Sequence, residues 1–342
     1  MRIGPVLRCL GAAALFGSAT PAAKLALAGV PPVTLAGLLY IGAGLAVLPF
    51  ALRAPRRAQP ASTRNRRRLA LAVLFGGAVG PALALLALAR APSASISIWL
   101  NLEMVMTALL ARAFFREHIG RAAGIGIALV FAASVWLASP DPGALAPAAT
   151  LALGASLAWA LDNNLTSVVD AYTPAQITVA KGLLAGAANL ALGLATERVL
   201  PEARPVALAL AIGAVGYGAS IVLYVRGAQE LGAARSQAIF ASSPVFGLVG
   251  AWLVIGEPVL SAQLGAAALV AAGIALVSHG RHAHTHAHDP ATHTHAHRHD
   301  DGHHDHVHDG ATPDLDHAHE HTHRALAHEH PHVPDLHHRH RH

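Results

Sequence analysis

The first 278 residues are a succession of apolar segments separated by short breaks that carry Pro, Gly or charge. A helix needs about 20 mostly apolar residues to cross a bilayer. Ten segments meet this condition, and they run over residues 7–28, 32–52, 69–89, 94–115, 121–138, 147–168, 175–195, 206–226, 235–255 and 261–278. The sequence therefore predicts an all-α integral membrane protein with ten transmembrane helices.

Composition argues against other classes of protein. Hydrophobic residues make up 54% of the chain and charged residues only 13%, which is unlike a soluble enzyme of this length. Residues 1–278 contain no phosphate-binding loop, nucleophile elbow or catalytic zinc spacing, so we expect no enzyme chemistry. Arginine outnumbers lysine 22 to 2, as is typical of a GC-rich bacterial genome. Residues 1–278 carry a net charge of +10 and residues 279–342 a net charge of −5, so the basic pI is no nucleic-acid signature and we expect no nucleic-acid partner.

The arginines predict the orientation in the membrane. If the N-terminus is cytoplasmic, the outer loops contain only Arg90, Arg198 and Arg204. Cytoplasmic loops of membrane proteins carry the excess of Lys and Arg. The inner loops then hold the remaining loop arginines, which are Arg53, Arg56, Arg57, Arg64, Arg66, Arg67, Arg68, Arg116, Arg121, Arg226 and Arg235. We therefore expect a multi-pass protein of the bacterial inner membrane with both termini in the cytoplasm.

The chain has an internal repeat. A shift of 140 residues places residues 101–117 over residues 241–257 and aligns Glu117 with Glu257, each of which ends a long apolar segment. Five helices per repeat is an odd number, so the two halves cross the membrane in opposite directions. Such inverted repeats are typical of secondary transporters, whose substrate site lies between the halves. We divide the chain into repeats at 1–140 and 141–278 and a tail at 279–342.

Several short motifs are spread over residues 5–278. They are Phe16-Gly17-Ser18 with Pro21 and Lys24, Leu100-Asn101-Leu102-Glu103 with Thr107 to Leu110 and Glu117, Ala158-Trp159-Ala160, Ser243-Pro244-Val245, and Gly256-Glu257. Together these motifs resemble the EamA-type permeases of the drug/metabolite transporter superfamily. The resemblance implies a transporter fold and leaves the substrate open. Met104 stands where the family usually has proline, which predicts a straighter fourth helix.

Few ionisable side chains lie inside the predicted helices, and such residues usually mark a transport pathway. The two acids are Glu103 and Asp162, and the two lysines are Lys24 and Lys181. The candidate substrate and proton pathway consists of Asp162, Asn163, Asn164, Thr166, Glu103, Asn101, Lys24, Lys181 and Trp159. Helical geometry puts Asp162 and Thr166 on one face and Asn163 about 100° away. The alternative is that the acids and lysines form buried salt bridges that serve only assembly.

The tail holds 24 of the 25 histidines and has almost no large apolar residues. Such a stretch cannot bury a core, so we expect disorder. Clustered imidazoles bind Zn²⁺, Ni²⁺ or Co²⁺, with affinity that falls below about pH 6.5 as they protonate. The candidate metal ligands are His282, His284, His286, His288, His293, His295, His297, His299, His303, His304, His306 and His308.

Two functions fit these observations. The first is a secondary transporter that exports a small metabolite or drug-like compound by proton exchange, with no required cofactor. The second is a divalent-metal efflux permease for nickel, cobalt or zinc, whose tail collects or senses the metal. The expected partners are the lipid bilayer, the transported solute or metal ion and, as one option, a second copy of the chain.

The arginine distribution yields a test of topology. A reporter protein fused after Ser278 should be active on the cytoplasmic side, and one fused at Asp141 should be active on the periplasmic side. Paired alkaline phosphatase and fluorescent-protein fusions measure this. The opposite pair of signals would reverse the orientation and move the tail out of the cytoplasm.

Overall fold

The computed structural model describes residues 3–53, 62–115, 121–138, 142–167, 169, 171–231, 239–240, 242–279, 282–288, 291–297, 317–323 and 326–332. These residues form two compact units, Met1–Gly280 and Arg281–His342, and we describe each by itself. Several predicted positions lie outside the described residues, namely Glu117, Asp141, His299, His303, His304, His306 and His308.

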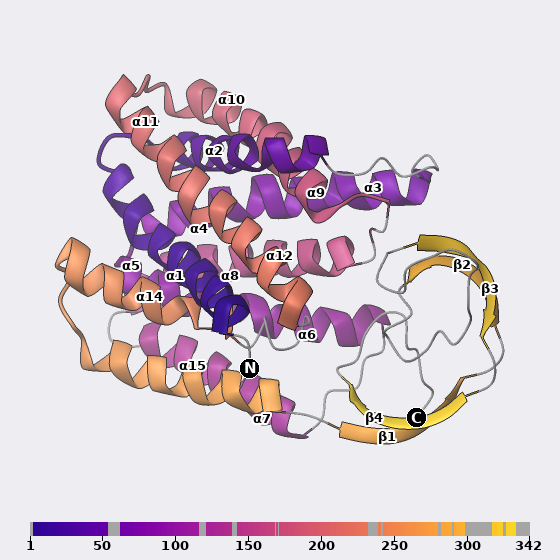
Figure 1. Ribbon diagram of the computed structural model, residues 1–342. Coiled ribbons are helices and arrows are strands. Elements are labelled where there is room, and N and C mark those ends of the chain that lie inside the picture. Colours follow the sequence, from indigo (N-terminus) through magenta and orange to yellow (C-terminus); the bar gives the residue numbers. More distant parts are fainter. Residues whose placement is uncertain are drawn as a thin grey trace. The chain divides into compact units, whose positions relative to one another are not determined.

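The first unit is entirely helical in its described residues (Figure 1). Four helical stretches contain a π-helical segment, labelled η. The elements are α1 (Ile3–Ala26), α2 (Pro32–Arg53), α3 (Thr63–Ala72), η1 (Val73–Val79), α4 (Gly80–Leu88), α5 (Ser93–Trp99), α6 (Leu102–Phe115), α7 (Arg121–Ala138), α8 (Pro142–Ser167), α9 (Pro174–Ala180), η2 (Lys181–Ala185), α10 (Gly186–Glu197), α11 (Ala203–Ile212), η3 (Gly213–Ala219), α12 (Ser220–Leu231), α14 (Ser243–Gly250), η4 (Ala251–Ile255) and α15 (Ser261–His279).

Seven helical stretches in the described residues are long and apolar enough to cross a membrane. They are Ile3–Ala26, Pro32–Arg53, Thr63–Leu88, Ser93–Phe114, Leu145–Thr166, Pro174–Glu197 and Ala203–Gly227. Three shorter apolar helices, Gly124–Leu137, Ser243–Ile255 and Ser261–Leu276, coincide with the remaining predicted segments. The all-helical membrane architecture is confirmed, while ten complete crossings stay a prediction.

The π-helical segments η1 and η3 lie 140 residues apart, at the offset of the internal repeat. Gly76 of η1 corresponds to Gly216 of η3, and both glycines are buried. A π-helical turn widens the helix locally and is frequent at functional sites. The third helix of each half therefore has the same irregular geometry, which supports the repeat without establishing its inversion.

The fourth transmembrane stretch is broken, so the expectation that Met104 makes it straighter is wrong. Helix α5 ends at Trp99, and α6 begins at Leu102 after a turn at Leu100 and Asn101. The Asn101 amide donates to the carbonyls of Ser97 and Ile98, at 3.1 and 3.0 Å, and so competes with continued helix. Proline is thus unnecessary for the break.

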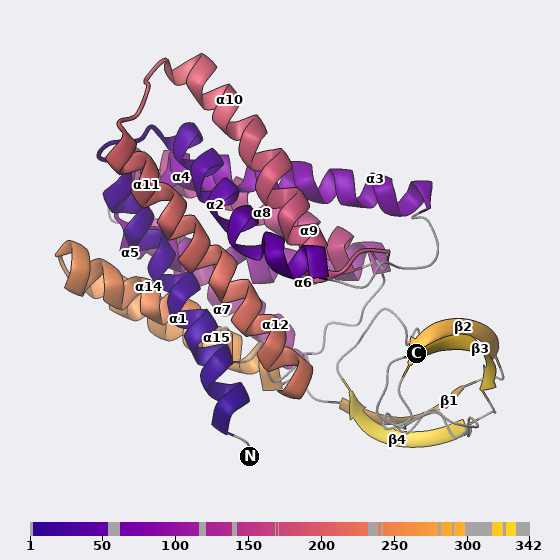
Figure 2. The same cartoon turned by 45° about the horizontal axis from the view of Figure 1, so that its top comes forward.

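Small residues let the helices of the bundle approach closely. Helices α10 and α11 pack along α2 (Figures 1 and 2). A methyl group added at Gly37 of α2 would collide with the backbone of Leu190, and one added at Gly182 would lie 2.6 Å from the Cα of Gly44. Lipid tails are as apolar as leucine, so tight packing rather than the hydrophobic effect holds such helices together. Helices α2 and α10 therefore form a backbone-to-backbone pair.

The described part of the tail is extended. Strands β1 (His282–His288) and β4 (Leu326–His332) pair antiparallel, as do β2 (Ala291–His297) and β3 (His317–His323). The register places His284 opposite His330 and His295 opposite His319. This differs from the disorder that composition predicts. The strict alternation of histidine with another residue has the period of two that suits extended backbone.

Candidate functional site

Asp162 and Lys181 form a buried ion pair between α8 and η2. The Lys181 ammonium lies 2.6 Å from one Asp162 oxygen and 2.7 Å from the other. Thr166, one turn after Asp162, donates its hydroxyl to the same carboxylate at 2.9 Å. This confirms the shared face of Asp162 and Thr166. It also agrees with the salt-bridge hypothesis for this pair.

A glycine of η1 makes room for this carboxylate. The Asp162 side chain lies against Gly76, where any side chain would collide with it. The Gly76 carbonyl accepts hydrogen bonds from the Tyr40 hydroxyl at 2.8 Å and from the Trp159 indole at 3.1 Å. The Gly80 amide donates to Phe75 and the next residue, Pro81, has no amide hydrogen, so the Gly76 carbonyl is free for side-chain donors. Trp159, singled out from the sequence, is therefore a partner of the π segment.

Glu103 lies apart from the ion pair and has an amide partner. Asn163 donates to the Glu103 carboxylate at 2.7 Å and lies 3.4 Å from the Thr107 hydroxyl. The neighbouring Asn164 is buried and donates to the backbone carbonyls of Thr107 and Ala160, at 3.2 and 2.9 Å. Asn164 therefore fixes α8 against α6, whereas Asn163 places an amide on Glu103.

Asn163 is exposed although it belongs to an inward face of α8. Leu153 and Leu157, 37% and 41% exposed, mark the outward stripe of this helix. At 100° per residue, Asn163 falls on the face of Ala152 and Ser156, which are fully buried. Asn163 is therefore exposed, and its partner Glu103 half-buried, on a face of α8 that is closed further along the helix.

Two predicted site residues have other roles. The Lys24 ammonium donates to the carbonyls of Leu88 and Ala91, at 2.5 and 2.9 Å, and is not hydrogen-bonded to Asp162 or Glu103. Asn101 bonds the backbone of its own helix at the break described above. The structure thus brings together Asp162, Thr166 and Lys181, and separately Glu103 and Asn163, with Lys24 outside both groups.

Sequence reasoning missed an aromatic row beside the site. The Tyr40 ring lies 6.0 Å from Tyr217 of η3, and Tyr217 lies 5.6 Å from Phe16, measured between centroids. Phe16 in turn contacts Phe240 at 5.4 Å. Since Tyr40 also bonds Gly76 of η1, it links the two equivalent π segments. The available signal was the group of glycines at residues 76, 77 and 80. Closely spaced glycines permit side chains of neighbouring helices, such as Tyr40, to approach the backbone.

The sequence model of the EamA-like transporter family matches the chain twice, over residues 4–139 and residues 146–279. The chain belongs to the EamA-like transporter family. The two matches coincide with the two predicted repeats and leave out the histidine-rich tail. The resemblance noted from the sequence motifs is confirmed, and this EamA-like protein is a transporter rather than an enzyme.

Relatives of this EamA-like transporter agree with that assignment. An uncharacterized transporter of Methanothermobacter thermautotrophicus is 25% identical over 281 residues, which cover 75% of this chain and 81% of that protein. A protein of known crystal structure superposes with a TM-score of 0.58 at 19% identity, over 81% of this chain and 96% of the other. This second likeness concerns the fold alone.

The buried ion pair yields a test by double-mutant cycle. Lys181→Met should destabilise the protein by about 3–5 kcal/mol, because it leaves a buried carboxylate without its partner. The double variant Asp162→Leu/Lys181→Met should recover much of that loss. Urea unfolding in detergent measures both. Leu184→Met, at a 65% exposed position nearby, is the control and should be neutral. Equal losses in the Lys181→Met and double variants would show that Asp162 does not depend on Lys181.

Proposed function

We propose that this EamA-like protein is a secondary transporter of the cytoplasmic membrane that exports a small metabolite or drug-like compound in exchange for protons. The observation that carries the proposal is the hydrogen bond between Glu103 and the exposed Asn163 on an inward face of α8. An ionisable group inside a membrane protein is expensive and is usually retained for transport. Glu103 has one amide partner and no cation within hydrogen-bonding distance among the described residues, so substrate or a proton can replace that partner.

The two carboxylates have different parts in this proposal. Asp162 is buried and already satisfied by Lys181 and Thr166, so it holds α8 and η2 together and keeps Lys181 in place. Glu103 is the proton carrier, because gaining a proton there leaves no unpaired cation behind. Substrate competes with Asn163 for the Glu103 carboxylate, which couples binding to protonation.

Export is the direction that we propose. Helix α5 contacts α1 and α14, whereas α6, which carries Glu103, packs chiefly on α8 and α7. The arginine distribution assigns the ends of α6 and α12 to the cytoplasm. In an exporter, substrate would approach Glu103 from that side.

For the tail we propose binding of Zn²⁺, Ni²⁺ or Co²⁺ as a peripheral property rather than as the cargo. The register of the two ladders sets histidines opposite each other, which brings imidazole-bearing residues into neighbouring positions. Within the described residues no group of three His, Cys, Asp or Glu side chains could hold a metal ion. The bundle therefore favours an organic substrate over a metal.

The proton-carrier assignment predicts the effect of neutral substitutions. Metabolites released by cells that overproduce the protein identify a substrate, and its uptake into inside-out vesicles then gives a pH profile. Glu103→Gln should lower the rate of proton-driven uptake at least tenfold, because an amide side chain does not gain and release a proton as a carboxylate does. Glu202→Gln, a change at an exposed residue near the start of α11, is the control and should be silent. An unchanged pH profile in Glu103→Gln would refute proton coupling through this residue.

Truncation after Ser278 separates the two candidate functions. The truncated protein should insert, export the metabolite at nearly the full rate and lose high-capacity binding of Ni²⁺ and Zn²⁺, since the family fold ends at residue 279. Growth of full-length, truncated and deletion strains across a metal series provides the comparison. Three identical curves are expected. Graded sensitivity to nickel, cobalt or zinc would favour the metal-efflux alternative and overturn our proposal.

A further inference from the structure

Two charged side chains hold the turn between α4 and α5 from opposite sides. Lys24, near the end of α1, donates to the carbonyls of Leu88 and Ala91. Glu257, which follows η4, accepts from the backbone amides of Ser93 and Ala94 at 2.7 and 3.0 Å, and from the Ser93 hydroxyl at 2.8 Å. We call Lys24, Glu257 and residues 88–94 the turn clamp.

The clamp satisfies backbone groups that helices leave unpaired. The last carbonyls of α4 and the first amides of α5 have no partners within their own helices. A cation suits the negative end of a helix dipole, and a carboxylate suits the positive end. Lys24 lies at the end of α4 and Glu257 at the start of α5, which are the matching ends. Each therefore makes charge-assisted hydrogen bonds, which are stronger than bonds between neutral groups.

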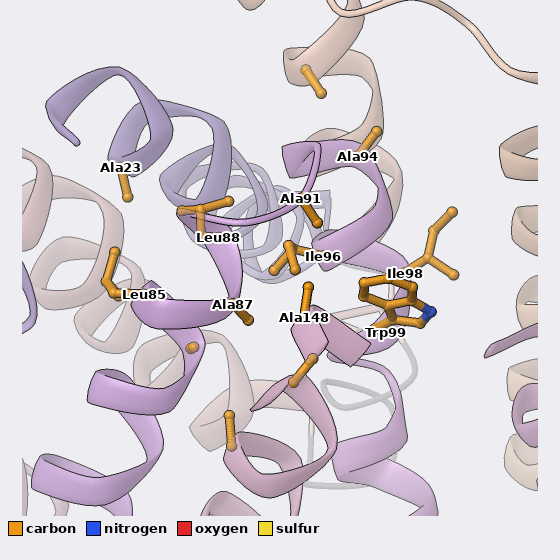
Figure 3. Close-up of a cluster of buried hydrophobic side chains, with 14 of the residues drawn as sticks. Ala23, Leu85, Ala87, Leu88, Ala91, Ala94, Ile96, Ile98, Trp99 and Ala148 are labelled. Carbon is orange, nitrogen blue, oxygen red and sulfur yellow. The ribbon is translucent and has the colours of Figure 1, made fainter. Parts of the chain in front are cut away.

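Apolar residues surround the turn clamp. Ala23, Leu88, Ala91 and Ala94 are each at most 4% exposed, and Figure 3 shows them together with Ile96 and Trp99. The bonds of the clamp are partly buried against this cluster, where a buried backbone amide or carbonyl left unpaired costs roughly 1–3 kcal/mol. The charged partners are therefore required for as long as the cluster stays closed.

Glu257 makes the clamp a bond between the two halves at this end of the bundle. Glu257 belongs to the second repeat, and the turn with Lys24 belongs to the first. Beyond the turn, α5 contacts α14, and a methyl group at Gly247 would lie 2.6 Å from the Ser97 hydroxyl. Further along, no extensive contact joins α6 to α14 among the described residues.

A second carboxylate cap lies in a different setting. Glu197, at the end of α10, accepts from the amides of Val33 and Thr34 at 2.8 and 3.0 Å. However, α2 and α10 also pack backbone to backbone along their length. That pair cannot separate without losing many contacts, so the Glu197 cap belongs to a rigid unit. The turn clamp instead holds the start of α5, which packs on α14 much less extensively than α2 packs on α10.

We propose that Lys24 and Glu257 keep the transporter closed at the end of the bundle where α4 meets α5. We call this pair the lock. Their bonds hold in the state seen here and break when the transporter opens at this end. Water that enters then replaces the lost partners, so the lock is strong when dry and inexpensive to open when wet. This rests on alternating access by the proposed transporter and assigns the lock to residues outside the Asp162 and Glu103 site.

An accessibility experiment in intact cells tests the lock without a substrate. The native cysteine is removed by Cys9→Ala, and Ser97→Cys places one thiol in the buried contact of α5 with α14. A membrane-impermeant maleimide in the medium reaches it only when this end opens. Glu257→Gln and Lys24→Met, on opposite sides of the same turn, should each raise the labelling rate on the order of tenfold, the effect of losing about 1.4 kcal/mol of closure.

Matched variants decide between a lock and general loosening. Glu202→Gln removes an exposed carboxylate close to the start of α11 and should not change labelling. Glu197→Gln should lower thermal stability and leave labelling unchanged. Unchanged labelling in a folded Glu257→Gln or Lys24→Met protein would overturn the proposal, as would an equal rise in Glu197→Gln. Labelling needs no substrate, so a negative labelling result would leave the assignment of Glu103 as proton carrier untouched. Likewise, a negative transport result for Glu103→Gln would leave the lock untouched.

Discussion

The need to pair every backbone polar group governs this bundle more than any other interaction. A bilayer offers no water to an unpaired amide or carbonyl, so a helix that is broken or widened inside it requires a partner from elsewhere in the protein. The interruptions seen here have such partners. Tyr40 and Trp159 bond the Gly76 carbonyl, and Asn189 donates to Ala78 of the same π segment at 3.0 Å. The irregular backbone and its polar side chains therefore depend on each other.

That dependence explains which polar residues have structural roles. Asn101, Lys24 and Glu257 all bond the backbone of the fourth helix or of the turn before it. From composition alone these residues look like Glu103 or Asp162, since all of them are polar groups in or beside apolar segments. Only position separates a side chain that completes a broken helix from one, such as Glu103, that bonds another side chain.

The sequence predicted the parts of the fold that depend on local pattern. Apolar length predicted the helices, and a 140-residue shift predicted repeats that coincide with the two family matches. It could not predict which lysine pairs with Asp162, because Lys24 and Lys181 have similar chemistry and differ only in their neighbours. The π segments were also missed, since Gly76 and Gly216 fit a regular helix equally well. Packing against α2 and α8 decides their geometry, and that information is not local.

The broken fourth helix connects the candidate site to the turn clamp. Ser93 and Ala94, held by Glu257, begin α5, and Glu103 lies in the first turn of α6. Between them the turn at Leu100 and Asn101 is held by amide bonds of Asn101 rather than by continuous helix. Such a turn permits α5 and α6 to tilt relative to each other at little cost. If both of our proposals hold, release of α5 at the clamp would move Glu103 against Asn163 on α8 and couple the opening of this end to protonation of the site.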